Sequence, residues 1–186
     1  MIKIENIIHW IYFIFNIISM DFSIIDEILN EKIFKSTKLA KILYVIMNKF
    51  DIPSKSYCIL GSYALRDYRE INDIDVDLDT KHFKKLKNCS IGNITVVNNE
   101  NVWTFQRKHR IINYKIEIYE VDPKIGFPNE SFSLISLFST SNDLQMDDFG
   151  HYHYRIKTVK RWKTIVRREK DEVDIILINS ILNSVN

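Results

Sequence analysis

The chain has 186 residues, of which 46% are hydrophobic, and its 26 Lys and Arg against 24 Asp and Glu give a net charge of +2. These values predict one globular domain, exclude disordered and low-complexity classes, and argue against a dedicated duplex-DNA binder. The two cysteines, Cys58 and Cys89, are too few for a disulfide framework, so a reducing, cytoplasmic location is expected.

An apolar stretch from Ile7 to Met20 lies near the start of the sequence. As a helix it would be about 21 Å long, short of the ~30 Å hydrocarbon core, so no transmembrane span is expected. A basic n-region and a small-residue cleavage site are absent, which argues against a signal peptide. We predict that residues 1–35 form a helical leader packed on a domain of residues 36–186. A translation start at Met20 and an interfacial anchor remain alternatives.

The first half of the domain alternates between helical and strand patterns. Apolar residues at helical spacing predict a helix from Ser36 to Phe50. Ser56–Leu60 is a short apolar run that predicts a strand, followed by a helical turn from Tyr63 to Tyr68. Strict alternation predicts a second strand over Ile71–Asp79, with its isoleucine, valine and leucine on one face and its aspartates on the other.

The second half is predicted to complete the sheet and then turn helical. Thr80 can cap a short helix through Leu86, and a β-meander follows over Ile94–Val97, Val102–Arg107 and Arg110–Val121. His151 and His153 could reach one metal from a strand, but such a pair more often lies in a polar loop, and no third ligand has suitable spacing. Helical periodicity then predicts helices over Ser131–Phe138, Tyr154–Lys170 and Asp171–Leu182. The expected fold is α+β: a small mixed sheet of about four to five strands within residues 56–122, flanked by helices, with a helical tail at 131–183.

The segment from Leu60 to Asp79 carries the chemistry. Gly61 directly follows a strand, so the chain can turn tightly and present its N–H groups, together with the Ser62 hydroxyl, to a phosphate. Asp73 and Asp75 are two residues apart on a strand and therefore project from one face. Because their charges repel unless a cation compensates them, the pattern predicts a site for a hard divalent ion such as Mg²⁺.

Two motifs in this segment, G-S-x-A-x-R at Gly61–Arg66 and N-D-I-D at Asn72–Asp75, resemble the signature of the nucleotidyltransferase superfamily related to DNA polymerase beta. Within that superfamily the chain is most similar to small minimal or abortive-infection-toxin-like nucleotidyltransferases. The resemblance extends at its widest from Tyr57 to Asp122. Asn72 stands where the family often has Ser or Thr.

The resemblance implies roles for individual residues. The first motif would contact a nucleoside triphosphate through Gly61, Ser62 and Arg66, and Asp73 with Asp75 would bind two Mg²⁺ ions, with Mn²⁺ as the alternative ion. The family's third carboxylate comes from a later strand. Glu117 is the candidate, although the family more commonly has Asp. Ile116 and Ile118 flank Glu117 as the apolar face, whereas Glu120 and Asp122 have the opposite parity.

The C-terminal sequence adds basic residues to this picture. It resembles the W-K and R-x-K-D-x-x-D-I ending of some of these enzymes, in which Lys163, Arg168 and Lys170 would approach the nucleotide. The alternative is a solvated basic face on which Lys170, Asp171 and Asp174 cap and ion-pair at a helix junction. Trp103, Phe105 and Trp162 could stack on a base, although large aromatic residues at such spacings usually belong to the core.

These observations favour a metal-dependent nucleotidyltransferase that moves a nucleoside monophosphate from a triphosphate, ATP among the candidates, to a hydroxyl of an RNA, a protein or a small molecule, with release of pyrophosphate. Asp73 and Asp75 would hold the metals, and Glu117 would complete the site and act as the base. A partner protein or a second copy could supply part of the acceptor site. The alternative is a binding or regulatory module that keeps the fold without turnover.

Overall fold

The computed structural model describes residues 22–121 and 143–184. The chain divides into two compact units, Met1–Glu31 and Lys32–Asn186. The described part of the first unit contains helix α2 (Ser23–Asn30). The predicted helix at Ser131–Phe138 and the apolar stretch Ile7–Met20 lie outside the described residues. Among the helices that are described, none is both long and apolar enough to cross a membrane.

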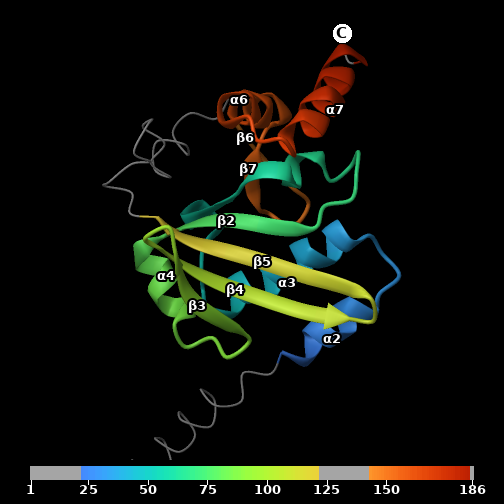
Figure 1. Cartoon of the computed structure of the whole chain (residues 1–186). Coiled ribbons are helices and arrows are strands. Elements are labelled where there is room, and N and C mark those ends of the chain that lie inside the picture. Colours follow the sequence, from blue (N-terminus) through green and yellow to red (C-terminus); the bar gives the residue numbers. More distant parts are fainter. Residues whose placement is uncertain (1–21, 122–142, 185–186) are drawn as a thin grey trace, which may run out of the picture. The chain divides into compact units, whose positions relative to one another are not determined.

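The second unit contains a mixed sheet, so the predicted α+β class is confirmed (Figure 1). Within the described residues the sheet has seven strands in the order β3-β4-β5-β2-β1-β7-β6, which corrects the predicted number of four to five. Its strands are β1 (Tyr57–Ile59), β2 (Asp73–Asp79), β3 (Gly92–Val97), β4 (Glu100–His109), β5 (Ile112–Val121), β6 (Leu144–Met146) and β7 (Tyr152–Tyr154).

The two strands that sequence reasoning missed, β6 and β7, have three residues each, which is too short for an alternating pattern to be recognised. The segment holding His151 and His153 was predicted to be a polar loop. That prediction was wrong, since His153 lies in β7 and both rings are fully buried. Tyr57 and Ala40 bond the ring of His151, and Arg66 and Gln145 contact that of His153.

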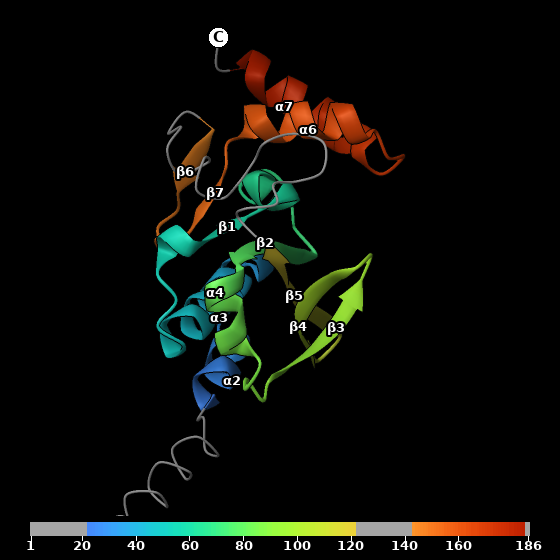
Figure 2. The same ribbon diagram turned by 90° about the vertical axis from the view of Figure 1, so that its left-hand side faces the viewer.

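One face of the sheet is covered by two helices, α3 (Lys35–Lys49) and α4 (Thr80–Leu86), which both contact β2 and β5 (Figure 2). The predicted helix at Ser36–Phe50 is thus confirmed within one residue at each end. Burial of apolar residues on these four elements drives the packing, at roughly 25 cal/mol per Å² of apolar surface. The fully buried members include Ile42, Leu43, Ile46, Ile74, Val76, Leu78, Phe83, Ile116 and Ile118.

A second core forms around β1, β7 and the helices α6 (Ile156–Val166) and α7 (Asp171–Ser184). Its buried members are Cys58, Ala64, Leu65, Leu144, Tyr154, Val159, Ile178 and Ile181. The helix predicted from Tyr154 to Lys170 is shorter than expected at both ends. Tyr154 belongs to β7, and Arg167 ends α6 with a left-handed φ of 47°.

The helix cap after β2 also differs from the prediction. Asp79, not Thr80, caps α4, because the Asp79 carboxylate accepts a hydrogen bond of 2.8 Å from the backbone N–H of His82. Asp79 is therefore committed to the helix start. Of the four aspartates on one face of β2, only Asp73, Asp75 and Asp77 remain for other roles.

Candidate metal centre and its cleft

The pairing of β2 with β5 brings two separate acidic segments together. The strands are parallel, with Asp73 opposite Lys115 and Asp75 opposite Glu117. Residues in register on neighbouring strands project from the same face. Asp73, Asp75 and Glu117 therefore converge, and one carboxylate oxygen from each lies within 4.8 Å of the others.

The chemistry of this cluster, which we call the acidic triad, fits a divalent cation. Three half-buried carboxylates supply the hard oxygen ligands that Mg²⁺ and Mn²⁺ take in proteins. The carboxylates of Asp73 and Asp75 have no hydrogen bond or ion pair within the described ranges. The triad therefore offers free lone pairs to an ion.

The electrostatics of Asp75 show what a bound cation would relieve. Burial, together with the neighbouring charges of Asp73 and Glu117, raises the pKa of Asp75 to about 6. Lys115 and Lys170 act the opposite way. Ionisation at neutral pH is therefore unfavourable for Asp75, and a bound cation would reverse that penalty.

Glu117 has a partner of its own. The Nζ of Lys115 lies 2.8 Å from its Oε2, and the two side chains are 34% and 19% exposed. Both come from the same face of β5, two residues apart. Lys115 thus occupies one edge of the triad and neutralises part of its charge.

The loop after β1 begins beside the triad. Leu60 donates a backbone hydrogen bond of 2.8 Å to the carbonyl of Asp75, so the chain leaves the strand next to that residue. Gly61 then adopts a φ of 59°, in the left-handed region, and a Cβ at this position would lie 4.0 Å from Oδ2 of Asp75. Space alone would admit a side chain, so the backbone conformation is what requires glycine here.

Opposite the triad, the start of α7 gathers basic side chains around two acids. Asp174 accepts hydrogen bonds from Arg69 at 2.8 and 2.9 Å and from the Ser62 hydroxyl at 3.3 Å, and Lys163 lies 2.9 Å from it. Burial acts against ionisation of Asp174, but the hydrogen bonds from Arg69 and Lys163 prevail and lower its pKa.

Asp171, one turn earlier, binds Arg168 and shares Lys163 with Asp174. Arg168 donates to it from Nε at 2.8 Å, and Lys163 reaches it at 2.7 Å in a pair whose side chains are almost fully buried. The hydrogen bond from Arg168 is the main reason why the pKa of Asp171 lies far below its ordinary value. We call Arg69, Lys163, Arg168, Lys170, Asp171 and Asp174 the basic wall.

A cleft of about 290 Å³ separates these features. It is lined by Gly61, Ser62, Asp73 and Asp75 together with all six residues of the basic wall. Lys170 is exposed, and no hydrogen bond or ion pair joins its ammonium to another side chain of the described ranges. Its charge is therefore available to an anionic ligand in the cleft.

The sequence-predicted residues divide accordingly. Gly61, Ser62, Asp73, Asp75, Lys163, Arg168 and Lys170 meet at the cleft, and Glu117 joins through the triad. Arg66 is placed elsewhere: its guanidinium lies over the ring of Tyr63 and contacts Nε2 of His153 at 3.2 Å. Its predicted role in nucleotide binding finds no support in this position.

Sequence reasoning missed Arg69 as a residue of the cleft and treated Asp171 and Asp174 only as members of the ion-paired alternative. The spacing of those two acids, three residues apart on one helix, was the available signal that they share a face. Arg69 carries no such signal, because only the fold brings it to α7.

Comparison with known proteins adds no relatives: no family model, no curated protein and no solved structure matches this chain. The resemblance to nucleotidyltransferases is therefore an expectation from the sequence motifs alone.

Proposed function

We propose that the protein is a metal-dependent nucleotidyltransferase that transfers a nucleoside monophosphate from a nucleoside triphosphate to a hydroxyl acceptor. The observation that carries the proposal is the cleft itself. An acidic triad suited to divalent cations faces a wall with four cationic side chains against two carboxylates, and a glycine turn lies between them. A triphosphate with its metal ions has the complementary distribution of charge.

The residues divide the work by their chemistry. Asp73, Asp75 and Glu117 would hold the metal, which supplies charge neutralisation at the phosphates and lowers the pKa of the acceptor hydroxyl. The Gly61 turn and the Ser62 hydroxyl would contact phosphate oxygens. Lys170, whose ammonium has no described partner, would meet the negative charge of the triphosphate.

The reaction balances with these groups. The acceptor oxygen forms a bond to the α-phosphorus, the bond from that phosphorus to the bridging oxygen of the β-phosphate breaks, and pyrophosphate leaves with the electron pair. The acceptor proton passes to a carboxylate of the triad, and Glu117 is the first candidate. Lys170 and Arg168, which line the cleft, would stabilise the charge on the leaving pyrophosphate.

The test is incubation of the full-length protein with each α-³²P-labelled triphosphate and Mg²⁺ in the presence of RNA, protein and small-hydroxyl acceptors. Label should appear on an acceptor or on the protein itself. Asp75→Asn should reduce transfer by on the order of 10²- to 10³-fold, the cost of losing one charge-stabilising group. Glu120→Gln is the matched control, because Glu120 lies on β5 three residues from Glu117 and bonds Asn101 instead. Transfer that is unchanged in Asp75→Asn would defeat the proposal.

A binding module without turnover is the second candidate, and the ion pair between Lys115 and Glu117 is the observation that favours it. An internal cation at the triad could replace part of a metal's charge. Nucleotide binding by the wild-type protein, with no transfer to any acceptor at any Mg²⁺ or Mn²⁺ concentration, would support this candidate.

A further inference from the structure

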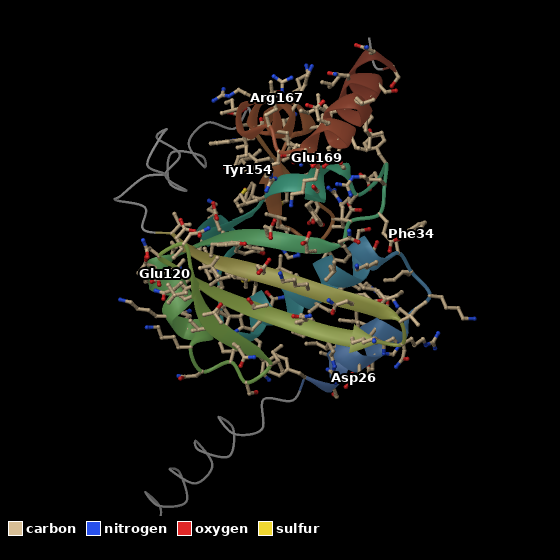
Figure 3. The ribbon with its side chains drawn as sticks, viewed as in Figure 1. Asp26, Phe34, Glu120, Tyr154, Arg167 and Glu169 are labelled. Atoms are coloured by element: carbon tan, nitrogen blue, oxygen red, sulfur yellow. The ribbon has the colours of Figure 1, made fainter. Side chains whose placement is uncertain are left out.

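A second cavity, of about 200 Å³, adjoins the cleft. Gly61, Lys163 and Arg168 line both spaces, so a ligand in the cleft can extend into the cavity. The cavity walls are largely apolar and include Val159 and Trp162 of α6. Tyr154, on β7 next to α6, is labelled in Figure 3 and also lines the cavity.

Two acids, Asp77 and Asp171, interrupt these apolar walls, and Asp171 already accepts hydrogen bonds from Lys163 and Arg168. Asp77 lines the cavity, is only 2% exposed, and its Oδ2 has no hydrogen-bond partner among the described residues. It lies on β2 opposite Cys58, on the same face as Asp75. Buried carboxyl oxygens are nearly always hydrogen-bonded, so an unpaired one that lines a cavity indicates a donor that arrives with a ligand.

The volume and the apolar lining of the cavity favour a flat ring as the ligand. An apolar cavity of ~150 Å³ is large enough to bind benzene, so this one can hold a heterocycle. Trp162 and Tyr154 supply aromatic surface for contact with a flat ring. Whether or not it is protonated, the carboxyl of Asp77 can accept a hydrogen bond from an N–H group.

We infer that the cavity receives the base of the nucleotide and that Asp77 accepts a hydrogen bond from an amino group on the edge of that base. The inference rests on the proposed function, because the triphosphate in the cleft is what directs the base into the cavity. Adenine, cytosine and guanine carry an exocyclic amino group, and uracil does not. Uracil offers only a ring N–H between two carbonyl oxygens and has no amino group to donate. The site therefore selects amino-bearing bases and rejects uracil.

The test measures equilibrium binding of ATP, CTP, GTP and UTP, and of inorganic tripolyphosphate, to the full-length protein with Mg²⁺. UTP should bind at least about tenfold more weakly than the tightest of the other three. Asp77→Leu should remove this preference and leave tripolyphosphate binding unchanged, because the cleft keeps its own residues. The variant should fold, since leucine replaces an unpaired buried acid with an apolar group of similar size.

A second variant tests the cavity without touching Asp77. Val166 lines it and is 54% exposed, so Val166→Trp should fill its mouth, weaken ATP binding and spare tripolyphosphate. Ile165→Trp is the matched control, because Ile165 is 59% exposed and is not part of the lining.

The outcomes separate the two proposals. Absence of both nucleotide and tripolyphosphate binding would defeat the proposed function and this inference with it. Equal affinity for all four nucleotides, a preference that survives Asp77→Leu, or a Val166→Trp variant that behaves like Ile165→Trp would overturn the inference alone.

Discussion

The acidic triad and the basic wall can be compared directly, because both place partly buried carboxylates at the same cleft. In the triad, burial and like charges raise the pKa of Asp75 to about 6, and Lys115 is the one cation paired with any of its three members in the described structure. In the basic wall, the hydrogen bond from Arg168 holds the pKa of Asp171 far below its ordinary value, and Asp174 is likewise bonded by Arg69 and Lys163.

The comparison distinguishes charged side chains that are neutralised by partners within the fold from charged side chains that have no such partner and could bind a ligand. A buried ion pair with good hydrogen bonds is internally balanced, so Lys163 with Asp171 mainly fixes α6 against α7. An unbalanced cluster lowers stability unless something from solution neutralises it. By that criterion, Asp73, Asp75 and Lys170 are the groups of the cleft that most need an external partner.

Lys163→Met would remove the cation that neutralises the two buried acids of the basic wall. The substitution leaves Asp171 and Asp174 buried without the ammonium that they share, at a cost of about 3–5 kcal/mol in the free energy of unfolding. Urea denaturation measures the loss. Lys157→Met is the control, because Lys157 is an exposed residue of the same helix, and it should change stability by less than about 0.5 kcal/mol. Equal effects of the two substitutions would refute a structural role for the buried pair.

Addition of Mg²⁺ should stabilise the folded protein by neutralising the acidic triad. An ion at the triad binds only the folded protein, so the free energy of unfolding should rise by about 2.7 kcal/mol at a concentration one hundred times the dissociation constant. Thermal melts with increasing Mg²⁺ measure this. Asp75→Asn should abolish the response, whereas Glu120→Gln should retain it. A metal response that persists in Asp75→Asn would place the ion elsewhere.

The pH dependence of stability should follow from Asp75 in protein stripped of metal. Because its pKa is raised in the folded state, the folded protein binds more protons than the unfolded chain between about pH 4 and 6. The stabilisation is therefore full below pH 4 and is lost as the pH rises through 6. Asp75→Asn mimics the neutral acid, so its stability relative to wild type should grow by about 1–2 kcal/mol between pH 5 and 7.5.

Urea titrations in EDTA across that range provide the measurement. Glu120→Gln should show no such trend, since it leaves the triad unchanged. A constant difference between Asp75→Asn and the wild type would mean that Asp75 is not strained by its neighbours.

The triad itself was predictable from the sequence. Alternation placed Asp73 and Asp75 on one strand face, and parity selected Glu117 over Glu120 on the later strand. Parity predicted the face of β5 on which Glu117 lies, but Glu117 can approach the two aspartates only if β5 pairs with β2. The parallel register that places Glu117 opposite Asp75 supplied that condition.

The basic wall was less predictable, because its geometry is tertiary. Arg69 and Asp174 are 105 residues apart, and no local pattern links them. The same limit hid the burial of Asp77. Strand periodicity assigns it to the polar face, but it lies opposite Cys58, a member of the core that α6 and α7 complete. Strand parity predicts the face of the sheet on which a side chain lies, and only tertiary packing decides whether that face is exposed to solvent.

Lys115→Met would test the ion pair between Lys115 and Glu117, which joins an internal cation to the acidic triad. The pair with Glu117 is partly exposed, so its loss should change the stability of the metal-free protein by less than about 1 kcal/mol. The same change removes the cation that competes with a metal for Glu117, so Mg²⁺ should bind about five times more tightly, roughly the effect of 1 kcal/mol. Lys108→Met, at the far end of β4, should leave the affinity as it was. Weaker Mg²⁺ binding in Lys115→Met would instead show that the lysine positions Glu117 for the ion, and the triad would then depend on an internal cation as the basic wall does.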